Sequence, residues 1–445
     1  MAMKNITLIL LVGTNPLPNL VVARYLLGQF DHQISISTIY LICSESNNKQ
    51  KGTKEYAENL KRLLEDTNIK LKRLLKDTNI KIELIPLSDV GNPESILAYL
   101  NNYPSWDEKS KYHLNYTGGT KTMSVHIHAF FKNKFRDIEF SYLDARTYTL
   151  KYDDGTYYPA NGDLRNYVKV TIEELLKLHG YEIKPDSFKN TTFDNVLDKF
   201  KKAIQEGSYR EFIDWYKDIR YIKSENNFKK TKDFIENLKR EFPINLKMIA
   251  EKFGDGIPQI AKEILDAFPD ENQIHFIENG EYKLWVPDQN KFKENFKNRV
   301  KNTWEYIDGK WLEHYVYDGL CKILQEKGLE EKKQYGWSLK SRNRENKEFE
   351  LDIFVINGYQ LIAISITTDD QKYIKPKGFE VIHRSRQIGG DESTAILITA
   401  LEKDKAIELQ KDLHINTGTS EERFKVFGIE DWKDINDKIL NFLDI

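Results

Sequence analysis

The sequence predicts an α/β protein in which two α/β domains flank a helical segment. Over the first 158 residues, short apolar runs alternate with helical patterns, which is typical of a mostly parallel sheet covered by helices on both faces. From residue 301 onward, one helical stretch precedes three strand-like runs and another helix. The intervening residues have a charged, helical pattern. We therefore expect domains at 1–158, 159–300 and 301–445.

The composition excludes several classes of protein. Charged residues make up 31% and hydrophobic residues 40% of the 445 residues, which indicates a globular chain. The 67 Lys and Arg residues nearly balance the 69 Asp and Glu residues, so a globally basic, nucleic-acid-coating protein is excluded. Cys43 and Cys321 alone cannot build a disulfide framework or a cysteine zinc site. Ile6–Val12 is too short for a membrane span, so we expect a cytoplasmic protein without a membrane partner.

The apolar runs of the first domain are expected to be strands. They are Ile6–Val12, Thr38–Cys43, Ile82–Leu87, His113–Tyr116 and Ile138–Leu143. Helical patterns occupy Leu17–Phe30, Glu55–Leu75, Pro93–Tyr99 and Thr120–Phe135. Residues 61–71 (KRLLEDTNIKL) are nearly repeated at 72–82 (KRLLKDTNIKI), which we interpret as a duplication that lengthens the second helix or its exit loop.

Two glycine-containing loops follow the first and fourth strands, at residues 13–16 (GTNP) and 117–121 (TGGTK). Glycines before a helix start expose backbone N–H groups, and the helix N-terminus adds partial positive charge, so both loops suit a phosphate. The spacing does not match a Walker loop. The alternative is that Gly118 and Gly119 only form a tight turn.

These two loops and the order of strands resemble the CARF (CRISPR-associated Rossmann fold) sensor domain of type III CRISPR effectors. The resemblance implies a Rossmann-like parallel sheet, a homodimer and a cyclic oligoadenylate activator, with cyclic tetra-adenylate as the expected ring. It also implies a set of ligand-binding residues from both loops. These are Gly13, Thr14, Asn15, Pro16, Thr117, Gly118, Gly119, Thr120 and Lys121.

In the middle of the chain, the spacing of apolar residues predicts helices over Val170–Phe268. A hairpin is expected at 273–287, because Asn279-Gly280 is a favoured turn. Helices followed by a hairpin resemble a winged-helix module, so this connector is expected either to space the two domains or to bind nucleic acid. The basic run Lys223–Lys232 is interpreted as a solvated face.

The last domain begins with the amphipathic helix WEYIDGKWLEHYVYDGL from Trp304, and strands are expected at Lys332–Ser338, Glu348–Ile356 and Gln360–Thr367. The last two strands are joined by an Asn-Gly turn. This order resembles the PD-(D/E)XK, or restriction-endonuclease-like, core. The segments GKWLEHYVY, EFELDIF and RQIGGDE resemble CARF-linked nucleases specifically.

Such a core hydrolyses phosphodiesters with a hard divalent cation held by carboxylates, here expected to be Mg²⁺ or Mn²⁺. Asp352 is the best candidate ligand in the sequence, with Glu350 and Glu313 as helpers. The alternative for Glu350 and Asp352 is a pair of solvating charges on a strand.

The second strand carries Ser365 and Thr367 where these nucleases usually have an acid and a lysine. A variant of this kind, with charges moved to the next helix, resembles a recurrent form among CARF nucleases. We therefore expect Lys377 to carry the positive charge and Glu380 to be a metal ligand, with Ser365 and Thr367 lining the site. Lys375 is the rival of Lys377. The alternative is a site that has lost catalysis.

Arg384, Arg386 and Gln387 follow on the same helix and are expected to contact nucleic acid. The alternative role of this segment is to end the helix, with Gly389 and Gly390 as the cap.

Together these observations predict a cyclic-oligoadenylate-activated endonuclease that cleaves DNA, RNA or both in antiviral defence. One alternative is a catalytically inactive CARF regulator or nucleic-acid-binding protein that retains a degenerate nuclease fold. Another is a sensor domain that also degrades its cyclic ligand.

Overall fold

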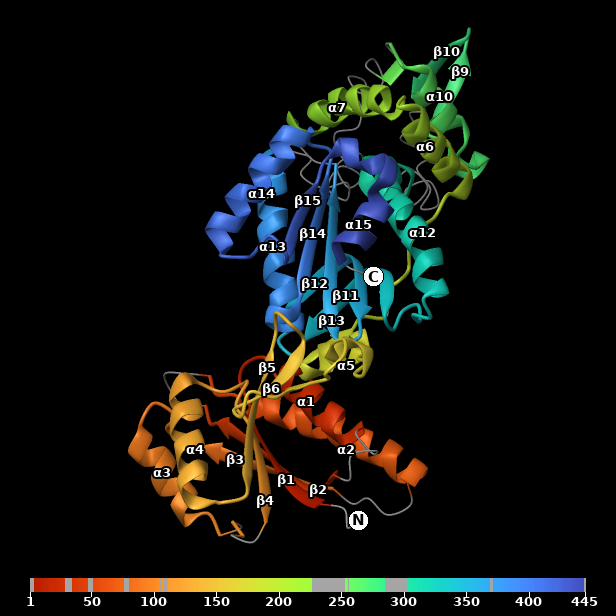
Figure 1. Ribbon diagram of the computed structural model, residues 1–445. Coiled ribbons are helices and arrows are strands. Elements are labelled where there is room, and N and C mark those ends of the chain that lie inside the picture. Colours follow the sequence, from red (N-terminus) through yellow and green to blue (C-terminus); the bar gives the residue numbers. More distant parts are fainter. Residues whose placement is uncertain are drawn as a thin grey trace.

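The computed structural model describes residues 4–28, 34–46, 51–75, 80–104, 106–107, 110–225, 253–254, 256–284, 302–368 and 371–443. Two large sheets dominate this part of the chain, and helices cover both of them (Figure 1). The N-terminal sheet lies at one end of the molecule, the C-terminal sheet in the middle, and the helical segment at the other end. The mixed α/β fold is confirmed. Within the described ranges, no helix combines the length and the apolar character needed to cross a membrane.

The N-terminal sheet has seven strands in the order β3-β2-β1-β4-β5-β6-β7. The strands are β1 Lys4–Leu11, β2 Ile34–Ser44, β3 Lys81–Leu87, β4 Lys111–Asn115, β5 Ile138–Asp144, β6 Thr149–Tyr152 and β7 Tyr157–Tyr158. The first five are parallel, whereas β6 and β7 form an antiparallel extension at one edge. The helices are α1 Leu17–Gly28, α2 Lys54–Leu75, α3 Pro93–Asn102 and α4 Lys121–Lys134. Because α1 and α2 pack on one face and α3 and α4 on the other, the predicted two-sided parallel sheet is confirmed.

The duplicated segment falls partly inside α2. Its first copy, residues 61–71, is helical throughout, and its second copy continues the helix to Leu75. Residues 76–79 of the second copy lie outside the described residues, and β3 begins at Lys81.

The C-terminal sheet has six strands in the order β15-β14-β13-β12-β11-β8. Its strands are β8 Tyr181–Ile183, β11 Tyr335–Asn343, β12 Glu348–Asn357, β13 Gln360–Thr367, β14 Thr394–Thr399 and β15 Phe424–Phe427. Its helices are α12 Trp311–Glu326, α13 Gln371–Gly389, α14 Lys403–Thr417 and α15 Ile435–Leu443. Side chains of α12 and α15 pack on one face, and those of α13 and α14 on the other. The expected order of helix, three strands and helix is present.

Residues 159–183 contribute to both domains. The short helix η2 (Leu164–Asn166) and α5 (Ile172–Leu178) pack against the N-terminal domain, whereas β8 pairs with β11 of the C-terminal sheet. Thr171 starts α5 through a capping box with Glu174, whose carboxylate also pairs with Arg24 of α1 at 2.7 Å. The expected connector at 159–300 therefore contains a strand of the C-terminal sheet.

The helical segment contains α6 (Asp194–Glu206), α7 (Tyr209–Glu225) and α10 (Gln259–Asp266), followed by the hairpin β9 (His275–Glu278) and β10 (Glu281–Leu284). The predicted hairpin is confirmed, because these strands pair antiparallel and Asn279 and Gly280 have φ of 54° and 80°, as a type I′ turn requires. Residues 226–252, which include most of the basic run 223–232, lie outside the described residues.

Two local expectations in the C-terminal domain were wrong. The turn between β12 and β13 consists of Gly358 and Tyr359, since Asn357 pairs with Gln360 and still belongs to its strand. Helix α13 begins at Gln371, so Pro376 lies inside the helix rather than at its start. A proline inside a helix removes one backbone donor, and packing of α13 against the sheet compensates for that loss.

The β12–β13 turn also joins the two domains. The Val170 N–H donates to the Gly358 carbonyl at 2.9 Å, and Arg165 Nη1 donates to Gln360 Oε1 at 2.8 Å. Next to this contact, the ring of Tyr148 lies between the guanidinium groups of Arg165 and Arg423, at 4.0 and 4.9 Å from its centroid. The domains therefore meet through cation–π contacts, one backbone hydrogen bond and one hydrogen bond between side chains.

Replacing Gly358 with alanine should lower stability more than the same change at Gly155. Both glycines have positive φ, at 64° and 89°, which costs an alanine about 1–2 kcal/mol. A Cβ atom at Gly358 would also clash with the backbone of Arg165, whereas the space around Gly155 is open. We expect Gly358→Ala to cost about 2 kcal/mol more than Gly155→Ala in thermal unfolding. Equal unfolding temperatures would contradict this account of the junction.

Candidate functional site

The two predicted ligand loops touch each other. Loop 1 (residues 13–16) and loop 2 (residues 117–121) follow the neighbouring strands β1 and β4. A Cβ atom on Gly118 would clash with the Leu11 carbonyl oxygen, and one on Gly13 would lie 3.1 Å from the Gly119 nitrogen. The glycines thus allow direct backbone contact, and both loops belong to one edge of the sheet.

Loop 2 leads into the N-terminus of α4. The Thr120 hydroxyl accepts a hydrogen bond from the Met123 N–H at 3.2 Å and so caps the helix. The Leu143 N–H donates to Thr117 Oγ1 at 2.7 Å, which fixes the start of the loop. Lys121 is the first residue of α4 and is exposed. The helix dipole and the Lys121 charge together favour an anion at this edge.

Loop 1 reaches the C-terminal domain. Asn15 Oδ1 accepts a hydrogen bond from the Leu17 N–H at 3.1 Å, and its amide nitrogen lies against Gly390, just beyond the end of α13. Thr14 is exposed and Pro16 is buried. Of these residues, Asn15 connects the ligand loop directly to the helix that carries Lys377.

Asp352 lies on β12 and is held by the neighbouring strand. Its Oδ2 atom accepts hydrogen bonds from Ser365 Oγ at 3.0 Å and from the Ile366 N–H at 2.8 Å. Burial raises the pKa of this carboxyl, while the charge of Lys377 and the Ile366 N–H act in the opposite direction. Ser365 therefore orients the carboxylate that the sequence indicated as the main metal ligand.

Glu313, in the first turn of α12, lies close enough to Asp352 for the two carboxyl groups to interact. Its side chain is 13% exposed, and Oε2 accepts hydrogen bonds from Trp337 Nε1 at 2.8 Å and Lys310 Nζ at 3.2 Å. Burial, with added repulsion from Asp352, raises the pKa of Glu313 to about 7. Two buried carboxyl groups from distant parts of the chain therefore interact here.

Lys310 is a site residue that the sequence analysis missed. It ends a single π-helical turn, η5 (Tyr306–Lys310), directly before α12. Burial lowers its pKa, but Glu313, Glu350 and Asp352 together outweigh that effect, and the pKa lies above its usual value. A π-helical turn at a functional site is a known pattern, but nothing in the sequence distinguished this lysine from its many neighbours.

Lys377, rather than Lys375, faces the carboxylates. Lys377 lines the same cleft as Glu313, and its charge lowers the pKa of Asp352. Lys375 instead pairs with Asp412 of α14 at 2.5 Å. The geometry thus favours Lys377 of the two lysines considered from the sequence.

A cleft of about 260 Å³ opens beside these groups. Thr367, only 3% exposed, contributes to its wall as expected. Thr368 Oγ1 donates to the Asp308 carbonyl at 2.9 Å and so joins the end of β13 to η5. The residues that line the cleft are Glu305, Asp308, Gly309, Lys310, Glu313, Ile366, Thr367, Thr368 and Lys377.

Among the described residues, Glu313 is the one predicted acid that lines this cleft, whereas Asp352, Glu350 and Glu380 are not part of its lining. Glu350 is exposed and accepts a hydrogen bond from Ser338 Oγ at 2.7 Å, and its charge contributes to the raised pKa of Asp352. The Glu380 side chain is 59% exposed, and its Oε1 lies 4.0 Å from Arg384 Nε. Glu380 is therefore placed on the outer face of α13.

The three residues expected to contact nucleic acid bind other parts of the protein. Arg384 lies over the Phe349 ring at 5.2 Å and donates to Gln387 Oε1 at 2.9 Å. Gln387 in turn donates to the Tyr181 hydroxyl at 2.9 Å, which ties α13 to β8. Arg386 is exposed and donates to the carbonyl of Thr417 at 3.2 Å.

The donor set fits one hard cation with a partly aqueous shell. Across the described ranges, no three His, Cys, Asp or Glu side chains come together as a metal cluster. Asp352 and Glu313 are two interacting carboxyl groups whose pKa values are both raised by burial, so a cation between them would relieve the cost of ionisation. Mg²⁺ commonly binds through one or two carboxylates plus waters and substrate phosphates.

Comparisons with known proteins support the N-terminal assignment. Residues 7–175 match the family model described as the Card1 CARF domain. The first domain is therefore a Rossmann-like CARF domain. No curated protein matches the chain in sequence.

Two solved structures resemble the whole chain. Can2 from Sulfobacillus thermosulfidooxidans, solved in complex with cyclic tetra-adenylate, is 15% identical with a TM-score of 0.58, over 99% of this chain and 100% of that one. Protein VC1899 from Vibrio cholerae is 12% identical with a TM-score of 0.59, over 99% and 98% of the two chains. At these identities the likeness concerns the fold.

The raised pKa of Glu313 predicts a pH-dependent stability in metal-free buffer. Between the usual pKa of 4.5 and about 7, the folded protein holds a proton that the unfolded chain has lost. The free energy of unfolding should therefore fall as pH rises through this window, by at most about 1.4 kcal/mol per pH unit. Chemical unfolding at several pH values measures it.

Glu313→Gln should flatten this dependence, because the amide does not titrate. Glu326→Gln, an exposed acid on the same helix, should retain the wild-type slope. If the free energy of unfolding depended on pH in the same way for wild type and Glu313→Gln, the raised pKa would not belong to Glu313.

Proposed function

We propose that the protein is a metal-dependent endonuclease that a cyclic oligoadenylate activates. The CARF match supports the sensor half of this proposal, and the resemblance to Can2, solved with cyclic tetra-adenylate, supports that ring as the ligand. The ligand residues are those of loops 1 and 2. A homodimer completes the site, since a symmetric ring needs only half a site from each protomer.

The observation that carries the nuclease half is the pairing of buried Asp352 and Glu313 beside two lysines. Isolated buried carboxylates are costly, and chains rarely keep them without a charged partner. Here Lys310 contacts Glu313, and Lys377 acts on Asp352. Glu313, whose pKa is raised to about 7, lines the cleft, and a shifted carboxyl group in a cleft is typical of catalytic sites.

The chemistry of this arrangement is phosphodiester hydrolysis. Asp352 and Glu313 would hold Mg²⁺ or Mn²⁺, and the bound ion would supply polarisation of the phosphate and a lowered pKa of a water molecule. Lys310 and Lys377 stabilise negative charge that develops on the phosphate. Ser365 keeps Asp352 in one orientation, and Thr367 shapes the wall of the cleft. Glu350 adds negative potential from the strand edge, and Glu380 takes no direct part in this version of the site.

One observation favours a second function. Within the described residues, Asp352 and Glu313 have no third metal-binding side chain close enough to complete a cluster. A regulator that retained the fold but lost catalysis would show this arrangement too. Such a protein would bind the cyclic ligand and nucleic acid without cleaving the nucleic acid.

Replacing Asp352 with asparagine separates these functions. Asp352→Asn removes a metal ligand and should reduce Mn²⁺-dependent cleavage of single-stranded DNA and RNA by at least about a hundredfold. Binding of cyclic tetra-adenylate, measured by calorimetry, should not change. Glu348→Gln, an exposed acid on the same strand that pairs with Lys184, is the matched control and should cleave normally. Full activity of Asp352→Asn would contradict the site.

Lys121→Ala tests the ligand loops. Loss of the charge at the start of α4 should weaken cyclic tetra-adenylate binding about tenfold, as expected for one charge-assisted contact to a phosphate. Lys132→Ala, exposed near the other end of α4, should bind as the wild type does. If Lys121→Ala bound cyclic tetra-adenylate with unchanged affinity, the ligand would not contact this end of α4.

A further inference from the structure

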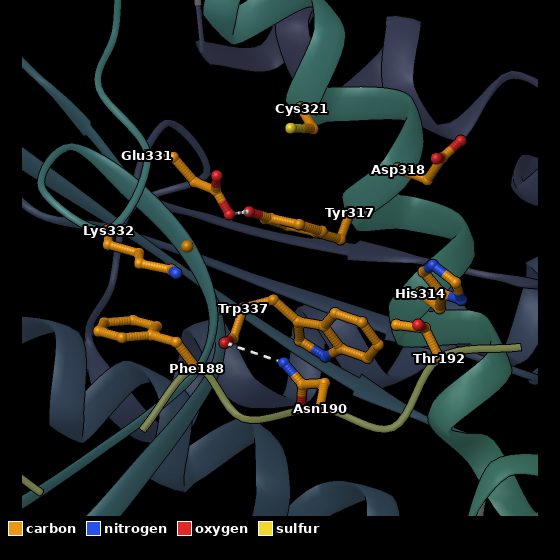
Figure 2. Close-up of a pocket in the computed structure, with 11 residues that line it drawn as sticks. Phe188, Asn190, Thr192, His314, Tyr317, Asp318, Cys321, Glu331, Lys332 and Trp337 are labelled. Atoms are coloured by element: carbon orange, nitrogen blue, oxygen red, sulfur yellow. Dashed lines mark hydrogen bonds between the residues drawn. The ribbon is translucent and has the colours of Figure 1, made fainter. Parts of the chain in front are cut away.

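A second cavity lies beside the candidate nuclease site and is lined largely by rings. It has a volume of about 270 Å³ and lies between α12, the start of β11 and the segment that follows β8 (Figure 2). Phe188, His314, Tyr317 and Trp337 bring their rings to it, and Asn190 and Lys332 add polar groups. The proposed reaction does not use this cavity.

The rings form an ordered aromatic wall. His314 stacks on Trp337 with centroids 5.1 Å apart and planes 14° apart, and Tyr317 lies 5.7 Å from Trp337. The His314 Nδ1 lies 2.8 Å from the Tyr306 hydroxyl, so a hydrogen bond fixes the plane of the imidazole against Trp337. A wall of this kind offers stacking partners to a flat, uncharged ring system.

Trp337 connects this cavity to the nuclease site. Its indole N–H donates to Glu313 Oε2 at 2.8 Å, while its ring lines the cavity. One side chain therefore separates the cavity from a proposed metal ligand. A molecule stacked on Trp337 in the cavity would therefore lie across this side chain from Glu313, which lines the cleft.

The edge of the cavity is polar and carries both signs of charge, with the carboxyl groups of Asp318 and Glu331 and the amino group of Lys332. Lys332 is exposed, and Figure 2 shows its amino group directed toward the rings. Asn190 Nδ2 donates to the Trp337 carbonyl at 3.3 Å, and Tyr317 donates to Glu331 at 2.7 Å. Aromatic walls with hydrogen-bonding groups at the rim suit a nucleobase, with its ring faces and polar edge, better than a purely apolar ligand.

Two residues of this wall have strained backbones. Phe188 and Lys332 have φ of 61° and 63°, although neither is glycine. Such conformations cost energy and are concentrated at ligand sites, where the surrounding structure holds them. Here the Phe188 N–H donates to the Ser338 carbonyl at 3.0 Å, and the Lys332 N–H to the Tyr335 carbonyl at 2.7 Å. These hydrogen bonds hold both residues in the strained conformation beside the cavity.

We infer that this cavity binds one nucleobase of a single-stranded nucleic acid substrate, unstacked from its neighbours and next to the phosphate to be cleaved. The inference rests on the proposed function and adds its substrate class. Tyr317 and Trp337 stack on the base, and Lys332 contacts the adjoining backbone. The cavity thereby selects single strands over duplexes, whose bases are paired and stacked.

The test uses the Asp352→Asn protein with cyclic tetra-adenylate and fluorescein-labelled oligonucleotides. A set of oligonucleotides carries one abasic site, moved one nucleotide at a time, and anisotropy measures their affinity. One position should bind roughly tenfold more weakly than the others, because stacking of one base is lost. Adding Tyr317→Leu should weaken binding of the oligonucleotide that has no abasic site. The affinity should then no longer depend on where an abasic site is placed.

Three further variants distinguish stacking from a structural effect. Tyr317→Phe keeps the ring and should restore both the affinity and the dependence on position. Tyr157→Leu, 53% exposed and distant on β7, should behave as the Asp352→Asn parent does. In an otherwise wild-type chain, Trp337→Phe keeps a ring but loses the N–H to Glu313, so cleavage should fall while affinity is retained.

The outcomes separate this inference from the proposed function. Equal affinity at every abasic position, with normal cleavage by the wild type, would overturn the base site and leave the nuclease intact. A position-dependent affinity without any cleavage by the wild type would support the base site and overturn the nuclease. Failure of every oligonucleotide to bind would overturn both.

Discussion

The C-terminal domain is organised around the buried carboxylate of Asp352. Ser365 and the Ile366 N–H hold one of its oxygens, and Lys377 supplies an opposing charge from α13. Without these partners, a charge at this depth would cost several kcal/mol or remain protonated. Ser365 therefore has a physical role, since its hydroxyl orients Asp352, whereas a carboxylate at this position would repel it.

The sequence predicted those features that depend on short stretches of chain. Alternating apolar runs identified the two-sided parallel sheet, and Asn279-Gly280 identified the separate hairpin of the helical segment, because periodicity and turn chemistry are local. The close approach of Gly13 and Gly118 also followed from their positions after neighbouring strands. In the C-terminal site, Asp352 and Glu313 were named in advance, and the structure brings them together.

The remaining features depend on distant contacts. Strand β8 has three residues, too few for a periodic signal, and its pairing with β11 spans about 160 positions. Lys310 belongs to the site because a π-helical turn places it beside Glu313. No sequence pattern distinguishes this lysine from the many other lysines of the chain. The placement of Glu380 on the outer face of α13 was equally hidden, because Pro376 suggested a later helix start.

The two halves of the molecule share a physical connection. Asn15 of loop 1 lies against Gly390, beyond the end of the helix that carries Lys377. Activation in the proposed function requires that the cyclic ligand bind one arrangement of the domains more tightly than another. This contact and the Tyr148 junction join the ligand loop to the domain that carries the proposed nuclease site.

The most direct measurement is cleavage by the wild-type protein in Mn²⁺, with and without cyclic tetra-adenylate. Single-stranded DNA, single-stranded RNA and plasmid DNA serve as substrates, with linear tetra-adenylate and cyclic hexa-adenylate as ligand controls. Our account predicts cutting of at least one single-stranded substrate that depends on the metal and is strongly stimulated by the cyclic ligand. Absence of cutting under every condition, or cutting at the same rate without a ligand, would contradict it.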